Sequence, residues 1–221
     1  MEIPRRIIIR VITRKVKFPC GELFLEGILG IPEDTEPFPA VIICHPHPLF
    51  GGNMDNNVVI SIFEALGRKS LIPFRFNFRG VGESQGEFSH GIGEQEDVRA
   101  AISFATSVKE IDSQRIGLVG YSAGAGFAFP ACFNDERVKA LAAISPPLAM
   151  FDFQFLKDCF KPKLLLSGSE DNFTPLPQFI EFCQSLPEPK KWEIIEGADH
   201  FWWGYESTVA TKVTAFFNEA L

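Results

Sequence analysis

Residues 115–133 read RIGLVGYSAGAGFAFPACF, and this stretch decides the fold class. A short apolar run typical of a buried strand leads into GYSAG at 120–124, and a segment typical of a helix follows. Between a strand and a helix, Gly-x-Ser-x-Gly places the serine on a sharp turn with its hydroxyl above the end of a sheet. Glycines two residues to either side leave room for the tight crossing. The stretch therefore predicts an α/β protein in which Ser122 is a nucleophile.

Strands and helices alternate on both sides of this motif. Apolar runs predict strands at 7–12, 22–31, 40–44, 72–78, 115–119, 138–144, 163–166 and 192–195. Helical spacing predicts helices at 54–69, 93–108, 123–133, 177–185 and 205–220. This alternation indicates a mostly parallel sheet with helices on both faces. The first two strands, joined through residues 19–21 without a helix, predict an antiparallel edge. Residues 1–221 are expected to form one domain of this class.

The order of residues along the chain selects a base for the serine. Serine is a weak nucleophile at neutral pH and needs a base within hydrogen-bond reach, itself held by a third group. In this chain order the base follows the nucleophile. Of the four histidines, only His200 lies after Ser122. It follows the predicted strand 192–195, on a loop at the edge of the sheet where ligands bind. His200 is therefore the predicted base.

The acid is expected between the nucleophile and the base, after another strand. Asp171 and Glu170 both follow the predicted strand 163–166. Asp171 is favoured, because the following Asn-x-Thr-Pro sequence can close a turn over its carboxylate. Asp199 is a third candidate, but its side chain should diverge from that of the neighbouring histidine. The predicted triad is thus completed by Asp171.

An acyl-transfer site needs N–H donors aimed at the developing oxyanion. Ala123, the residue after the nucleophile, is predicted to supply one backbone N–H. The second is expected from the loop HPHPLFGG at 45–52. Because its two prolines lack an N–H, His47 is the first choice and Leu49 the second. The two histidines of this loop have no cysteine nearby and no evident third ligand, so no metal site is predicted.

Taken together, these motifs resemble the α/β-hydrolase superfamily over nearly the whole chain. More narrowly, the chain is similar to small, lidless serine hydrolases related to dienelactone hydrolase and to the peptidase-like esterases. The matching pieces are HPHP at 45–48 with GG at 51–52, NFRGVGES at 77–84, GYSAG at 120–124, GSED at 168–171 and DH at 199–200. The resemblance implies about eight strands, no cofactor and hydrolysis through an acyl-enzyme. Dienelactone hydrolases use a cysteine nucleophile, so a serine at 122 argues against that particular activity. The 77–84 stretch is interpreted as a structural turn.

Many α/β-hydrolases carry a lid before the strand that bears the acid. Here that interval is 145–162, which is too short for a domain and contains alternating phenylalanines. These could line a small apolar acyl pocket or simply pack in the core. The expected pocket residues are Leu49, Phe151, Phe153 and Trp202. The sequence thus predicts an open site for small or short-chain acyl esters or thioesters.

The amino-acid composition limits the kinds of partner that the protein is expected to bind. The net charge of −7 argues against nucleic acid and against an anionic membrane, because both favour clusters of Lys and Arg. Five widely spaced cysteines without Cys-x-x-Cys predict reduced thiols and, with no signal-like segment, a cytoplasmic protein. The expected partner is a small-molecule acyl substrate. A peptidase or amidase with the same triad, and a non-catalytic binding protein on the same fold, remain alternatives.

Overall fold

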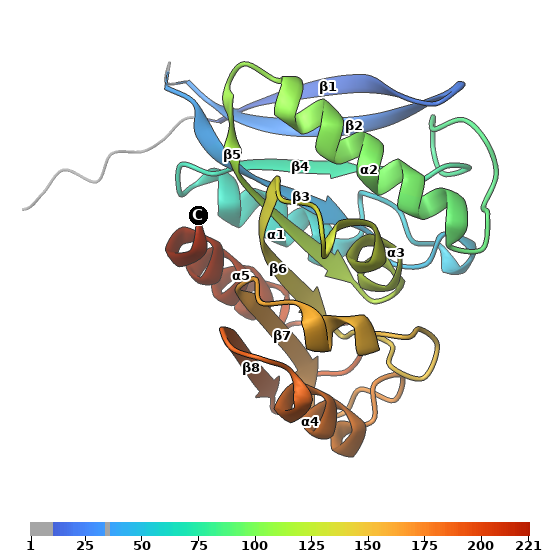
Figure 1. The fold of residues 1–221 in the computed structure, drawn as a ribbon, viewed down its shortest axis with the longest axis vertical. Coiled ribbons are helices and arrows are strands. Elements are labelled where there is room, and N and C mark those ends of the chain that lie inside the picture. The colour runs from blue at the N-terminus through green and yellow to red at the C-terminus, as the bar shows by residue number, and fades with distance from the viewer. Residues whose placement is uncertain (1–10, 34–35) are drawn as a thin grey trace, which may run out of the picture.

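An eight-stranded sheet forms the centre of the molecule (Figure 1). The structure is a computed structural model that describes residues 11–33 and 36–221. The strands are β1 (Val11–Cys20), β2 (Leu23–Pro32), β3 (Phe38–Cys44), β4 (Ile72–Phe76), β5 (Ile111–Tyr121), β6 (Val138–Ile144), β7 (Lys163–Gly168) and β8 (Lys190–Ile195). Their order across the sheet is β1-β2-β4-β3-β5-β6-β7-β8. The β1–β2 and β2–β4 pairs are antiparallel and the others are parallel. The predicted mostly parallel sheet with an antiparallel N-terminal edge is confirmed.

Helices cover both faces of this sheet. They are α1 (Asn57–Gly67), α2 (Ile92–Ser107), α3 (Ala123–Cys132), α4 (Leu176–Ser185) and α5 (Glu206–Ala220), with short 3-10 turns η1 (Pro48–Phe50) and η2 (Gln154–Asp158). The buried side chains of α2, α3 and α4 join one core cluster, and those of α1 and α5 join the other, on the opposite face (Figure 1). Within the residues that the structure describes, no helix combines the length and apolar character needed to cross a bilayer.

The first strand differs from its prediction. The sequence placed a strand at 7–12 and a connection at 19–21; residues 7–10 lie outside the described residues. β1 continues to Cys20 and pairs with β2 along its whole length. The strand lies at the sheet edge, where one face can carry charge and a proline such as Pro19 is tolerated. Charged residues that interrupt the apolar run therefore mark a half-exposed strand.

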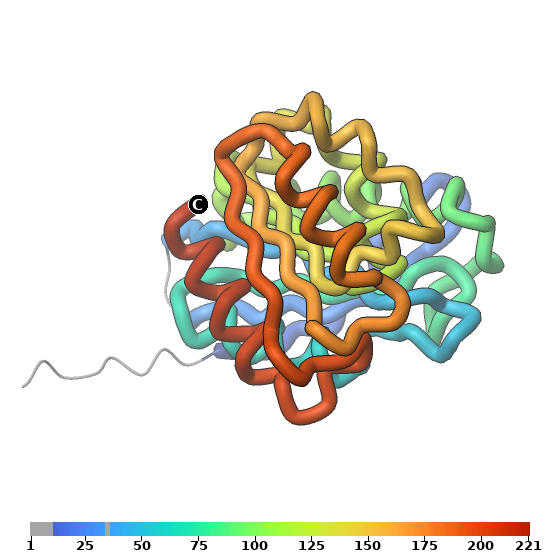
Figure 2. Tube along the Cα trace, turned by 90° about the horizontal axis from the view of Figure 1, so that it is seen from below, coloured from blue at the N-terminus to red at the C-terminus, as the bar shows by residue number. Residues whose placement is uncertain are grey.

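The opposite edge of the sheet is β8, and Figure 2 views the molecule from this end. Among the described strands β8 pairs with β7 alone, and all six of its residues are at least partly exposed. Lys190, Lys191 and Glu193 place charge on this edge, which discourages pairing with other chains. The strand is nevertheless part of the site, because the short loop after it carries His200.

Candidate active site

Ser122 sits on a strained turn between β5 and α3. Its φ is 52° and its ψ −127°, a positive-φ conformation that few non-glycine residues adopt. A Cβ at Gly120 would lie 2.4 Å from the Cα of Ala125, and one at Gly124 would lie 2.4 Å from the carbonyl oxygen of Cys44. Both distances are impossible for real atoms. The two glycines are thus required by the close approach of the helix start to β5 and to the end of β3.

The structure brings the three residues of the predicted triad into one hydrogen-bonded chain. The Ser122 Oγ lies 2.9 Å from the Nε2 of His200. The Nδ1 of His200 lies 2.9 Å from each carboxylate oxygen of Asp171. All three side chains are buried, with residue exposures of 8%, 7% and 5% in the order Ser122, His200, Asp171. They come from the loops after β5, β8 and β7, so the carboxyl edge of the sheet positions all of them.

The carboxylate of Asp171 is held by a turn and by several donors. The backbone N–H groups of Phe173 and Thr174 donate to its Oδ1, each at 2.9 Å. Burial acts to raise the pKa of Asp171, but hydrogen bonds from His200, the Ser145 hydroxyl and the Phe173 amide bring it below its ordinary value. The carboxylate is therefore ionised at neutral pH and can fix one tautomer of the imidazole.

The two other acid candidates lie elsewhere. Glu170 is exposed at the surface. Asp199 accepts hydrogen bonds from the backbone N–H groups of Phe201 and Trp202, at 2.9 and 2.8 Å. Its carboxylate thus closes the turn that carries the histidine, rather than contacting the imidazole.

Three side chains have supporting roles that were not anticipated. Tyr121 donates its hydroxyl to the main-chain oxygen of His200 at 2.8 Å. The indole Nε1 of Trp202 donates to Ser145 Oγ at 3.0 Å, and Ser145 in turn helps to lower the pKa of Asp171. Trp202 and Ser145 are fully buried, and both have positive φ, at 61° and 48°. One signal could have revealed Ser145: it directly follows β6, at the same sheet edge as the triad.

Two backbone N–H groups are available beside the serine. Neither the Ala123 N–H, at the start of α3, nor the His47 N–H has an acceptor among the described residues. The Leu49 N–H donates to the Nδ1 of His47 at 3.2 Å, so this second-choice donor is already engaged. The loop is tight: the Gly52 N–H donates to the His47 carbonyl at 3.0 Å, and a Cβ at Gly52 would lie 2.1 Å from the Pro46 oxygen.

The buried ring of His45 anchors the start of this loop. The Phe78 N–H donates to its Nε2 at 3.1 Å, so the ring proton is on Nδ1, which donates to the Pro46 carbonyl at 2.7 Å. Burial lowers the pKa of His45 to about 4, and the ring is neutral at pH 7. Both ring nitrogens are engaged with backbone groups, which makes the ring a structural bridge between the loop and the turn after β4.

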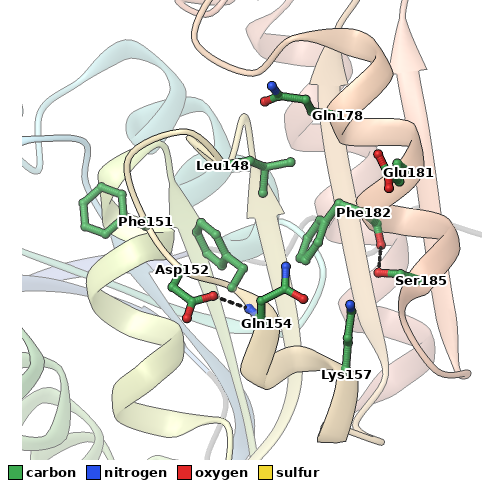
Figure 3. A pocket seen from close by; sticks show the side chains of 10 residues that line it. Leu148, Phe151, Asp152, Gln154, Lys157, Gln178, Glu181, Phe182 and Ser185 are labelled. Carbon is green, nitrogen blue, oxygen red and sulfur yellow. Dashed lines mark hydrogen bonds between the residues drawn. The ribbon is translucent and has the colours of Figure 1, made fainter.

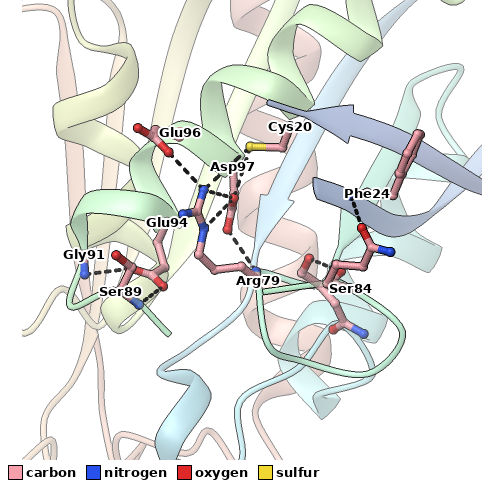
Figure 4. A network of polar contacts seen from close by, with 11 residues as sticks. Cys20, Phe24, Arg79, Ser84, Ser89, Gly91, Glu94, Glu96 and Asp97 are labelled. Atoms are coloured by element: carbon pink, nitrogen blue, oxygen red, sulfur yellow. Dashed lines mark hydrogen bonds and ion pairs between the residues drawn. The ribbon is translucent and has the colours of Figure 1, made fainter. Parts of the chain in front are cut away.

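The 77–84 turn is itself fastened to α2 (Figure 4). The Nη2 of Arg79 lies 2.8 Å from Oδ1 of Asp97, a fully buried carboxylate that also accepts the Cys20 thiol. At the start of α2, the buried Glu94 carboxylate accepts the backbone N–H groups of Ser89 and Gly91. The contact between Arg79 and Asp97 agrees with the interpretation of 77–84 as a structural turn.

A cavity of about 400 Å³ opens beside Ser122 and His200. Four large apolar side chains lie at its mouth and remain largely exposed: Phe50 (80%), Met150 (55%), Phe173 (49%) and Phe201 (52%). Contiguous exposed apolar side chains at a concave site are typical of ligand binding.

None of the four expected pocket residues lines this cavity. Leu49 is 65% exposed outside it, and Trp202 is fully buried beneath the site. Phe151 packs against Phe127, and Phe151 and Phe153 line a separate groove between η2 and α4 (Figure 3).

For three of these four residues, the neighbouring residue in the sequence lines the cavity instead. Phe50 lines the cavity instead of Leu49, Met150 instead of Phe151, and Phe201 instead of Trp202. Neighbouring residues on an irregular loop point in different directions, and the sequence pattern does not give those directions.

Comparisons with known proteins agree with this architecture. A family model described as the dienelactone hydrolase family matches residues 25–203. The uncharacterized protein RP471 of Rickettsia prowazekii is 34% identical over 171 residues, 74% of this chain and 71% of that protein. The structure of an α/β serine hydrolase homologue from Coxiella burnetii has a TM-score of 0.83 and 32% identity, and the match covers 91% of this chain and 96% of that one. XC6422 from Xanthomonas campestris, described as a serine hydrolase without lid, has a TM-score of 0.78 and 25% identity over 100% of this chain and 98% of that one.

The chain spans about half the length of three further curated relatives, from Escherichia coli. The fold is that of the α/β-hydrolases, and the fully described segment 145–162 contains η2 in place of a lid domain. The family match includes the turn with Ser122 and both loops that complete its hydrogen-bonded chain. By fold and by sequence, the chain belongs to the dienelactone hydrolase family.

Proposed function

We propose that the protein hydrolyses small or short-chain carboxylic esters, or thioesters, through a Ser122–His200–Asp171 triad and an acyl-enzyme. One observation carries this proposal. The Ser122 Oγ is 2.9 Å from a histidine nitrogen whose partner nitrogen is 2.9 Å from both oxygens of a buried carboxylate. This is the geometry in which an imidazole takes a proton from a serine and is held in the correct tautomer.

In the acylation half, His200 Nε2 accepts the Ser122 proton as Oγ attacks the carbonyl carbon of the substrate. The negative charge that develops on the carbonyl oxygen is stabilised by the N–H groups of Ala123 and His47, which have no competing acceptor among the described residues. When the tetrahedral intermediate collapses, the imidazolium returns its proton to the departing alkoxide or thiolate.

In the deacylation half, water takes the place of the leaving group. His200 removes a proton from the water, the hydroxide attacks the acyl carbon, and Ser122 leaves with the proton from the imidazolium. Asp171 stays ionised throughout and stabilises the positive imidazolium, in keeping with its lowered pKa.

The size of the cavity supports a small substrate. A volume of about 400 Å³ must hold both the acyl and the alcohol part of the ester. This lies near the lower end of the range of about 300–1,000 Å³ for ligand pockets. A long acyl chain would extend beyond the cavity walls into solvent.

The test begins with a fluorophosphonate probe, which labels activated serines covalently. We expect labelling of the wild type and none of Ser122→Ala, whose kcat on butanoate esters should fall by about 10⁶-fold. Circular dichroism checks that both proteins are folded. A folded wild type that neither labels nor hydrolyses esters would contradict the proposal and favour a binding protein. Greater activity on long-chain esters, or on a matched amide, would contradict the substrate class.

A further inference from the structure

The position of the base defines where the leaving group of the substrate must lie. His200 Nε2 gives its proton to the departing oxygen, so that oxygen must come within hydrogen-bond reach of the imidazole. The substituent on this oxygen therefore extends along the His200 side of the cavity. The side chains that flank His200 are therefore the ones positioned to contact the alcohol part of the ester.

Two aromatic rings flank His200 on this side. The Phe173 ring centroid lies 4.6 Å from that of His200, and the Phe201 centroid lies 5.8 Å from it. Both phenylalanines line the cavity, and each is about half exposed, so each ring keeps surface available for a ligand. They are carried by the same loops as the acid and the base, directly after Asp171-Asn172 and after His200.

The two rings are nearly perpendicular. Their planes meet at 83° and their centroids are 6.3 Å apart, so they form a corner. A third aromatic ring that stacks with an offset on one of them presents its edge to the other. These are the two arrangements that aromatic pairs favour. A saturated ring of similar size gains neither, and the two rings offer no strong hydrogen-bond partner to a sugar or glycerol group.

We propose that Phe173 and Phe201 form a leaving-group subsite that selects esters of aromatic alcohols. This rests on the proposed function, because it uses His200 as the proton donor to the leaving group. It adds a specificity that the triad alone does not give: the alcohol part of the substrate is an arylalkyl group, and its ring occupies the corner between the two phenylalanines.

The experiment compares three butanoate esters with the wild-type protein: ethyl, 2-phenylethyl and 2-cyclohexylethyl. Two carbons separate each ring from the ester oxygen, so the leaving-group chemistry is closely matched. Cyclohexyl is the larger and more apolar ring, so apolar burial alone would favour its ester. Aromatic contacts with the two phenylalanine rings reverse this order. We therefore expect kcat/KM for the 2-phenylethyl ester to be about fivefold higher than kcat/KM for the 2-cyclohexylethyl ester.

Variants then test which residues cause the preference for the phenyl ester over the cyclohexyl ester. Phe173→Leu and Phe201→Leu keep an apolar side chain but remove a ring, and each should bring the phenyl-to-cyclohexyl ratio to about one or below. Phe160→Leu is the control, because Phe160 is 71% exposed and does not line the cavity. It should keep the wild-type ratio.

The wild-type ratio alone tests the inference even if a variant does not fold. A ratio of one or less overturns the subsite, and so does a preference that both ring variants retain. Hydrolysis of the ethyl ester with Ser122 labelling would leave the proposed function intact in either case. Loss of both ethyl ester hydrolysis and labelling in the folded wild type would instead overturn the proposed function and, with it, the subsite.

Discussion

The buried imidazole of His45 should make the fold sensitive to mild acid. Its pKa is about 4 in the folded protein and about 6.5 in an unfolded chain. Between these values the unfolded chain binds more protons, so stability that is fully present above pH 6.5 is lost as the pH falls toward 4. Each pH unit within this window costs about 1.4 kcal/mol. Acidification from pH 7 to pH 5 should therefore lower the free energy of unfolding by about 2 kcal/mol through this one residue.

The main structural reason is burial of the ring, which disfavours the charged imidazolium, and the hydrogen bond from the Phe78 N–H to Nε2 acts in the same direction. A proton on Nε2 removes that acceptor and places a charge in a fully buried site.

Urea unfolding at pH 7, 6 and 5 measures the effect, with His45→Gln as the comparison. The glutamine amide has one donor group and one acceptor but does not titrate in this range. Other groups contribute equally to both proteins, so the wild type should lose about 2 kcal/mol more than the variant over this interval. If both proteins lose the same stability, the assignment of the acid sensitivity to His45 is refuted.

Three further outcomes are expected. Asp171→Asn should lower kcat by about 10⁴-fold with unchanged circular dichroism, because the imidazole loses its orienting carboxylate; a loss below tenfold would argue against this role. Trp202→Phe removes a buried hydrogen bond and should destabilise the protein by about 1–3 kcal/mol in urea, whereas Trp203→Phe, at a 69% exposed residue, should cost less than about 0.5 kcal/mol. Equal effects would contradict this reasoning. All five cysteines are buried, and burial raises the pKa of Cys20 to about 11 and that of Cys183 to about 12, so Ellman's reagent should react only as the protein unfolds. Prompt labelling of the native protein would be the opposite result.

The sequence was sufficient for the sheet and for the order of the candidate triad. Each strand after β1 corresponds to an apolar run of its own in the sequence. A strand that is followed by a serine between two glycines is compatible with few backbone structures. Choosing His200 required only chain order and a loop after a strand. Asp171 required one step more, a turn sequence that could close over its carboxylate, and two backbone N–H groups do so.

The residues that line the cavity could not be predicted in this way. On strands and helices the side-chain direction follows from the period, but Leu49, Phe50, Met150 and Phe151 lie on short turns without one. The bond between Trp202 and Ser145 joins residues 57 positions apart. It also depends on positive φ at both, a conformation that neither residue type favours and that the surrounding structure imposes.

The weak attachment of β8 separates loss of activity from loss of the fold. A strand with one neighbour among the described strands and no fully buried residue opens at a lower free energy than the whole protein, as a partial unfolding event visible in hydrogen exchange. Such opening withdraws His200, while Ser122 stays on the central strand β5. Amides of β8 should therefore exchange faster than those of β3 and β5. Rising denaturant should first yield a largely folded protein with an inactive serine, and only later an unfolded chain.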